Sequence, residues 1–444
     1  MNKQYTDIFK TLVKSYYEDN FEEKISELLD KEDVDKKVLS EIICSLCGVK
    51  VDYSDNFTSD LKKAITSYKA KEKIISKLSA CGSCKDGACI NACPFNAILK
   101  DPITNLSYID MDSCTDCGLC VEACDLGHIV DKVEFMPIME LFKSGKPVIA
   151  AVAPAITGQF GENVTMDMLR EAFMRVGFKD MVEVAFFADM LTIKESVEFN
   201  RFVKSKDDLM ITSCCCPMWV GMLKKVYKDL VKYVSPSVSP MIAAARSLKK
   251  LNPDCKVVFV GPCIAKKGEA KEKDLIGDVD FVLTFQELQG IFDILEINPS
   301  TLKGVSSLEY ASRGGRLYAR TGGVSIAVSD AIKEMYPEKY DLLQAVQCQG
   351  VIDCKKMLSA AQNGELKANF IEGMGCVGGC VGGPKAIISK EQGKKAVDDF
   401  AFDSSYKVAT HSDIMLDILN RMGISSIEDF KDHSKIEIFE RDIF

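Results

Sequence analysis

The chain has 444 residues, of which 47% are hydrophobic and 27% are charged, and its formal net charge is -9. That length is sufficient for two or three domains with a sizeable core, and the negative charge argues against nucleic acid as a partner. The sequence contains no uninterrupted apolar run of about 18 residues, so it predicts no membrane span. Its first residues, MNKQYTDIFK, do not resemble a signal peptide, and we expect a cytoplasmic location.

Cysteine is the most informative residue type, with 19 cysteines against only 3 histidines. A secreted disulfide scaffold would be short and rich in loops, whereas this chain is long and has helical periodicity. Clustered cysteines in such a chain more often bind metal or carry redox chemistry. The scarcity of histidine favours thiolate-rich iron–sulfur sites over histidine-rich metal sites.

Residues 1–75 are predicted to be helical, because apolar residues recur near helical spacing in YTDIFKTLVKSYYEDNFEEKISELLDK. Within this region Cys44 and Cys47 have C-x-x-C spacing. They could form a redox dithiol or half of a metal site. We favour a third interpretation, two partly buried cysteines at a helix end, because no second pair lies nearby in the sequence.

Residues 76–140 are predicted to form a ferredoxin-like α+β domain with two cysteine motifs, CGSCKDGACINACP and CTDCGLCVEAC. The second motif has the spacing of bacterial ferredoxins, in which the fourth cysteine of each motif binds the other cluster. The first motif has two extra residues before its third cysteine. A pair of zinc knuckles is the alternative, which the fourfold runs and Pro94 disfavour. We therefore expect two 4Fe–4S clusters, one bound by Cys81, Cys84, Cys89 and Cys124 and the other by Cys93, Cys114, Cys117 and Cys120.

Residues 141–444 alternate between strand and helix signals. Short apolar runs read as buried strands in KPVIAAVAP, DLMITSC, KVVFVGPC and VDFVLTF, and amphipathic stretches such as MDMLREAFMRVGF and PMIAAARSLKKL lie between them. A further helix is expected in HSDIMLDILNRMG, near the end. This alternation predicts an α/β domain with largely parallel sheets flanked by helices.

Three cysteine-bearing stretches lie within this α/β domain: ITSCCCPMWVG, VFVGPCIAKKGEA and EGMGCVGGCVGGPKA. The first two directly follow predicted strands, and ligand sites in open α/β sheets lie off the carboxyl ends of strands. The glycines of the third permit close approach of the backbone to a cofactor. We expect the three loops to converge on one buried cofactor.

In order and spacing these stretches resemble the signature loops of FeFe hydrogenases, which run T-S-C-C-P-x-W, M-P-C-x-x-K-x-x-E and E-x-M-x-C-x-x-G-C-x-x-G-G. The resemblance covers the chain from about residue 80 to its end. It implies a two-lobed domain that holds the H-cluster, a 4Fe–4S cubane linked to a diiron subsite with CO, cyanide and azadithiolate. Maturation proteins insert the diiron half. The cubane ligands implied are Cys216, Cys263, Cys376 and Cys380.

The resemblance also implies roles around the diiron subsite. Lys266 would donate hydrogen bonds to a cyanide, and Met374 would pack against the bridging carbonyl. Cys215 would pass protons to the subsite, with Ser235 and Glu269 at further relay positions. Residues that border the site or shape its pocket would be Ala153, Pro154 and Trp219.

Cys214 is an additional thiol, since the common first loop has two cysteines. One interpretation is a buried, small hydrophobic side chain. The other is that Cys214 changes the packing of the loop and lets Cys215 bind the open iron under oxidation, which would give a protected state.

Several positions depart from the family pattern. When the helix before the first loop is aligned from Thr192, the two relay glutamates of the family fall on Ser196 and Phe199. The usual proton exit is then interrupted, which leaves water, Glu195 or Glu198 as alternatives. Other departures near the diiron subsite are Gly261 in place of Met, Met241 in place of Gln and Gly375 in place of Ala.

The sequence therefore predicts an FeFe hydrogenase that oxidises H2 and reduces protons and exchanges electrons with ferredoxin or a similar small carrier. One alternative is a hydrogen sensor with slow turnover. Another is a non-enzymatic relative used in iron–sulfur assembly, which the tandem cysteines of the first loop and Lys266 disfavour.

Overall fold

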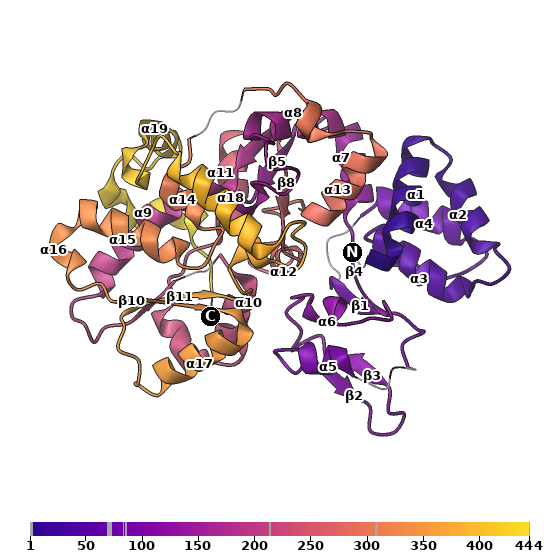
Figure 1. Ribbon diagram of the computed structural model, residues 1–444, viewed down its shortest axis with the longest axis horizontal. Helices are drawn as coiled ribbons and strands as arrows, with labels where there is room; N and C mark the ends of the chain where they lie inside the picture. The colour runs from indigo at the N-terminus through magenta and orange to yellow at the C-terminus, as the bar shows by residue number, and fades with distance from the viewer. Residues whose placement is uncertain are drawn as a thin grey trace.

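The computed structural model describes residues 3–68, 73–82, 84, 87–212, 215–306 and 310–443. The chain begins with a group of helices at one end of the molecule (Figure 1, indigo). Cys44 lies in the third of them and Cys47 directly follows it, and both are buried. Burial raises the pKa of the Cys44 thiol to about 12, which suits the helix-end interpretation better than a redox thiolate. These helices are α1 (Thr6–Tyr17), α2 (Phe21–Leu29), α3 (Lys36–Leu46) and α4 (Phe57–Thr66).

The cysteine-rich region folds as two antiparallel strand pairs and two short helices. Strands β1 (Ile75–Lys77) and β4 (Ile129–Asp131) pair with each other, as do β2 (Ile98–Lys100) and β3 (Ser107–Ile109). The helices, α5 (Ala88–Ala92) and α6 (Leu119–Glu122), both carry motif cysteines. Helix α7 (Phe135–Lys143) then leads into the α/β domain.

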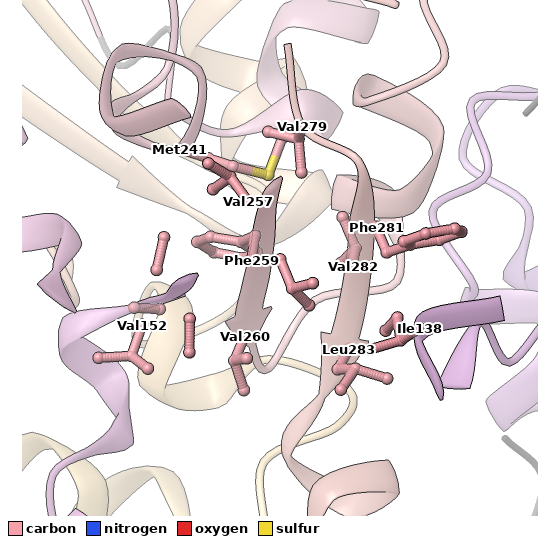
Figure 2. Packing of buried hydrophobic residues seen from close by; sticks show 14 of the residues in the cluster. Ile138, Val152, Met241, Val257, Phe259, Val260, Val279, Phe281, Val282 and Leu283 are labelled. Carbon is pink, nitrogen blue, oxygen red and sulfur yellow. The ribbon is translucent and has the colours of Figure 1, made fainter. Parts of the chain in front are cut away.

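The described residues of the remainder form two parallel sheets, which confirms the predicted α/β class. One sheet has the order β6-β5-β8-β9 and the other β10-β11-β7, and every pairing within them is parallel. Strands buried on both faces read as continuous apolar runs, and this explains KVVFVG and FVLT. Figure 2 shows β8 and β9 packed with Met241 and Ile138. The strands are β5 (Val148–Val152), β6 (Asp180–Glu183), β7 (Met210–Ile211), β8 (Lys256–Gly261), β9 (Phe281–Thr284), β10 (Ala345–Gln349) and β11 (Phe370–Met374).

Helix α9 (Val184–Phe202) runs through the interior, and its residues from Val184 to Phe199 are all buried. A helix that is buried on all sides must pair any charged side chain that it carries. The other helices of the domain are α8 (Met166–Val176), α10 (Pro217–Lys225), α11 (Pro240–Leu251), α12 (Ala265–Glu269), α13 (Phe285–Ile294), α14 (Arg313–Leu317), α15 (Gly323–Met335), α16 (Pro337–Tyr340), α17 (Gly350–Gln362), α18 (Lys390–Phe402), α19 (Asp413–Arg421) and α20 (His433–Ile436). In the described part of the chain, no helix combines the length and apolarity that crossing a membrane requires.

A buried ion cluster joins the cysteine-rich region to the α/β domain. The Lys267 ammonium, on α12, lies 2.6 Å from a Glu287 carboxylate oxygen and 3.3 Å from one of Asp131, and all three side chains are fully buried. Burial alone would raise the pKa of Asp131, but the surrounding cations, Lys267 and Lys385 among them, lower it. Lys267 also donates to the carbonyl of Lys132. One lysine thus connects the end of β4 to the helix that follows the second cysteine loop.

Lys267→Met should destabilise the protein strongly, because it leaves two buried carboxylates without their shared cation. We expect the free energy of unfolding to fall by about 3–5 kcal/mol, measured by urea denaturation. Lys395→Met is the matched control. It removes the exposed pair with Asp399 and should cost less than about 1 kcal/mol. Equal effects of the two substitutions would contradict this role of Lys267.

Candidate active site

The motif cysteines of residues 76–140 line two separate cavities. One, of about 350 Å³, is lined by Cys81, Cys84, Cys89 and Cys124, and the other by Cys93, Cys114, Cys117 and Cys120. The fourth cysteine of each motif therefore lies with the first three of the other motif. This is the grouping expected from the sequence, and the role of these residues as cluster ligands remains a prediction.

The three cysteine loops of the α/β domain come from both sheets and meet. Cys216 directly precedes α10, Cys263 lies between β8 and α12, and Cys376 and Cys380 follow β11. Burial raises the pKa of Cys263 to about 11 and that of Cys380 to about 12, and the neighbouring Cys216 thiol contributes to both shifts. The pKa of Cys376 is also raised, first by burial and then by the other three thiols. Contacts agree with this proximity: Cys216, Cys263 and Cys376 pack against one small apolar cluster, and the Gly375 amide donates to the Cys216 sulfur at 3.3 Å.

Glycines in and beside these loops are needed because large side chains pack on them. A Cβ atom at Gly373 would overlap the Trp219 ring, and one at Gly375 would lie 2.6 Å from Cβ of Met218. Trp219 is fully buried and donates a hydrogen bond to the carbonyl of Thr212 at 2.9 Å. This indole therefore packs between the first loop and β11. Gly375, which departs from the family pattern, leaves the space that Met218 occupies.

Lys266 is buried beside the thiols. Its ammonium donates a hydrogen bond to Oε2 of Glu269 at 2.6 Å. Burial lowers the pKa of Lys266, but the charge and hydrogen bond of Glu269 oppose that effect and the pKa is raised, so the side chain stays charged. The other oxygen of Glu269, Oε1, is buried and has no hydrogen-bond partner among the described residues. The site thus combines four thiols with a fixed buried cation.

The other predicted site residues lie around this group. Met374 ends β11 and packs in the same apolar cluster as Cys215 and Cys216. Ala153 and Pro154 follow β5, and a Cβ atom at Gly261 would lie 3.3 Å from that of Ala153 and 2.6 Å from the Phe259 ring. The space that a Met side chain would need at position 261 is therefore occupied by Phe259. Cys214 lies outside the described residues.

Cys215 packs against the same apolar cluster of side chains as Met374 and is close to the other thiols. Burial raises its pKa well above the ordinary value for a thiol, and Cys380 and Cys216 raise it further, whereas Lys266 lowers it. Burial and the neighbouring thiols therefore favour the neutral thiol form of Cys215. A neutral thiol can both donate and accept a proton.

The structure corrects the alignment of the relay positions. The Ser196 hydroxyl donates to the carbonyl of Thr192 at 2.8 Å, and Phe199 packs against Phe370, so neither side chain faces a polar route. Glu195 and Glu198, one residue earlier in each case, face the polar interior instead. A shift of one residue turns a helical side chain by about 100°, and this is why an alignment anchored on Thr192 selects the wrong face.

Glu195 and Glu198 lie in a polar network. Glu195 accepts a hydrogen bond from the Thr212 hydroxyl, and Glu198 Oε2 accepts one from Ser235 at 2.6 Å. Burial raises the pKa of Glu195 to about 8; the hydrogen bond from Thr212 opposes this effect and the charge of Glu198 adds to it. The carboxyl groups of Glu195 and Glu198, two of the alternatives left by the sequence, therefore lie in one polar network with Ser235 among the described residues.

Sequence reasoning gave no role to Lys194 or Tyr318, which complete this network. The Tyr318 hydroxyl lies 2.9 Å from that of Thr192, and its pKa is raised by burial first and then by Glu195 and Cys215, among others. Lys194 is fully buried next to Glu198. The sequence did contain a signal for Lys194: the stretch LTIKESVEF places charged residues in an otherwise apolar helix.

Comparison with protein families identifies the α/β domain. The family described as "Iron only hydrogenase large subunit, C-terminal domain" matches residues 146–384, more than half of the chain. The chain belongs to the iron-only hydrogenase family. Residues 73–125 match a 4Fe-4S dicluster domain, which favours iron–sulfur clusters over zinc knuckles in the first cysteine motifs of this chain.

Individual relatives are distant. The chain is 27% identical to iron hydrogenase 1 of Clostridium pasteurianum, over 54% of this chain and 50% of the relative. It is 26% identical to the NADP-reducing hydrogenase subunit HndD of Solidesulfovibrio fructosivorans, over 61% and 55%. The chain thus spans about half the length of these relatives. An apo FeFe hydrogenase HydA1 variant of Chlamydomonas reinhardtii has the same fold, with a TM-score of 0.57 and 23% identity over 66% of this chain and 93% of that one.

The raised pKa of Glu195 predicts a protonated carboxyl group at neutral pH in this protein. Folding disfavours the ionised form of Glu195. Between about pH 4.3, the ordinary pKa of glutamate, and about pH 8, the folded state therefore binds more protons than the unfolded state. Stability should therefore fall as pH rises through that window. Glu195→Gln should remove this part of the slope, measured as urea midpoints from about pH 5 to about pH 8.5.

An infrared difference spectrum between the two proteins should show a carboxylic acid band that disappears above about pH 8. Asp189, whose pKa burial raises to about 7, contributes a similar band in both proteins and cancels in the difference. A wild-type and a Glu195→Gln protein with identical pH slopes and no such band would show that Glu195 is ionised.

Proposed function

We propose that this protein is an FeFe hydrogenase that oxidises H2 and reduces protons at an H-cluster held by Cys216, Cys263, Cys376 and Cys380. The observation that carries the proposal is the convergence of these four desolvated thiols with the buried ammonium of Lys266. Thiolates are the ligands that iron–sulfur clusters use, so the donor set fits the cubane. When bound, the H-cluster supplies the heterolytic cleavage or formation of the H–H bond.

The protein's own contribution at this site is position and charge. The Lys266 ammonium, held by Glu269, would donate to an anionic cyanide, and a buried charge-assisted hydrogen bond of this kind is strong. Met374, fully covered at the end of β11, would form an apolar wall on another side. Ala153 and Pro154, at the end of β5, would border the same site, and the proximity of Ala153 to Gly261 supports that role.

Protons would travel from the site along the polar network of α9. Cys215 would exchange a proton with the buried site, and Glu195 would take the proton up; both residues contribute to the raised pKa of Tyr318, so both lie near that hydroxyl. From Glu195 the proton would pass to Glu198, one helical turn away, which is hydrogen-bonded to Ser235. A Glu195 pKa of about 8 suits this task, because a relay works best when its pKa lies near the operating pH.

Electrons would enter through the two 4Fe–4S clusters of the dicluster domain. Cys117, a proposed ligand of one cluster, packs in a single apolar cluster with Met218 and Ala265, against which Cys216, Cys263 and Cys376 also pack. This contact supports direct electron transfer between that cluster and the cubane. The distal cavity, with Cys84 exposed, would face the redox carrier, for which a small ferredoxin is our proposal. A cytoplasmic location and maturation by H-cluster assembly proteins belong to the same proposal.

The cofactor assignment can be tested by infrared spectroscopy after maturation with H-cluster assembly proteins. The loaded protein should show bands of iron-bound CO and cyanide and should evolve hydrogen with a strong reductant. Cys216→Ala should lack the bands, because one cubane ligand is removed. A fully matured wild-type protein without these bands would refute the proposal. Bands with very slow turnover would favour the hydrogen-sensing alternative.

The role of Cys215 can be separated from that of the ligands. Cys215→Ala should keep the CO and cyanide bands but lose about 10²–10⁴-fold in hydrogen turnover, the range for a positioned proton-transfer group. Cys255→Ala is the matched control, because it makes the same replacement at a cysteine that is buried in the main apolar core. Turnover retained in Cys215→Ala would exclude this thiol from the proton route.

A further inference from the structure

Glu198 has a second buried contact besides Ser235. The Lys194 ammonium donates to Glu198 Oε1 at 2.5 Å and to the Ser237 hydroxyl at 3.0 Å. The Lys194 side chain is fully covered, and the next carboxylate, that of Glu440, lies 3.6 Å from the ammonium. Burial of an ammonium is costly and is weak evidence for stabilisation even when the charge is paired. The position of Lys194 therefore calls for a role beyond packing.

Glu440 connects this interior lysine to the surface. The C-terminal segment pairs with the segment that carries Ser235 and Ser237: Ser237 forms an antiparallel bridge with Glu440, and the Arg441 amide donates to the carbonyl of Pro236. This pairing fixes Glu440 beside Lys194. The Glu440 carboxylate in turn lies 2.9 Å from Nδ1 of His433.

His433 ends the series at the surface. Its side chain is 64% exposed, whereas that of Glu440 is 17% exposed and that of Lys194 is fully buried. Its second ring nitrogen, Nε2, lies 3.5 Å from a guanidinium nitrogen of Arg201, in an exposed contact. Exposure thus increases step by step along Lys194, Glu440 and His433.

We propose that Lys194, Glu440 and His433 form the outer part of the proton route, carrying protons between Glu198 and solvent. This proposal rests on the function proposed above, because it takes Glu198 as the inner relay. The Lys194 ammonium gives a proton to Glu440 and takes one from Glu198, and Glu440 passes its proton to His433. His433 exchanges it with water at its exposed ring. Each side chain returns to its starting protonation state, so no other reactant is needed.

A competing exit lies at Ser235. This residue lines a surface cavity of about 990 Å³ together with Pro236, Lys232 and Tyr233. Water in that cavity would receive protons from Ser235 without Lys194. Two observations favour the Lys194 series. Its members all bind and release protons and lie within hydrogen-bond distance of one another, except for the 3.6 Å ion pair between Lys194 and Glu440. Backbone pairing also fixes the position of Glu440.

The test uses surface substitutions in the full-length, cluster-containing protein, because Lys194→Met risks misfolding. The readout is the rate at which the buried carboxyl groups exchange their proton for deuterium after mixing with D2O, followed by the shift of their infrared band. Glu440→Gln and His433→Ala should slow this exchange by about 100-fold, the lower end of the range for a positioned proton-transfer group. Added imidazole should restore the rate in His433→Ala, which a purely structural role would not permit.

His411→Ala is the matched control, because His411 is also exposed and paired with a carboxylate, that of Glu334 at 3.0 Å, outside the Lys194 series. It should exchange at the wild-type rate and not respond to imidazole. Unchanged exchange in both Glu440→Gln and His433→Ala would overturn the proposal in favour of the cavity at Ser235. Slowed exchange in a protein without CO and cyanide bands would support this route while refuting the hydrogenase function.

Discussion

The arrangement of the whole molecule depends on one buried ammonium, that of Lys267. It neutralises Asp131, at the end of the cysteine-rich region, and Glu287, on α13, where all three side chains are fully covered. The neighbouring residue in sequence is Lys266, which lies beside the thiols. Two consecutive lysines on one short helix therefore have different contacts: Lys267 pairs with Asp131 of the cysteine-rich region, and Lys266 places a positive charge beside the thiols of the candidate site. Any displacement of α12 would move both Lys266 and Lys267 and change the contacts of each.

Close packing extends this constraint to the clusters. The αL conformation of Gly118, which directly precedes α6, brings the backbone against Ile264, and a Cβ atom there would overlap the Ile264 side chain. Gly268 similarly adjoins Asp116. The cysteine motif around Cys117 and the second cysteine loop thus interlock directly. The separation between the dicluster region and the second cysteine loop is therefore fixed by close packing, as the proposed electron transfer between them would require.

The sequence predicted the α/β class, the parallel strands and the grouping of the cysteines well, because each depends on local pattern or fixed spacing. It failed where the answer depends on the face of a helix. Glu195 and Ser196 are adjacent in sequence, yet only Glu195 faces the polar network. Lys194 and Glu440 are far apart in the sequence, and only the pairing of the C-terminal segment brings them together. No local pattern contains that information.

The glycines at positions 261 and 375 limit how this site can be altered. A side chain at position 261 would press on the Phe259 ring, and one at position 375 would lie 2.6 Å from Cβ of Met218. Every residue except glycine has a Cβ atom, so exchanging Met218 for a smaller side chain would not relieve the second contact. A larger residue from a relative would therefore require the backbone around Met218 to move, and not only a side chain.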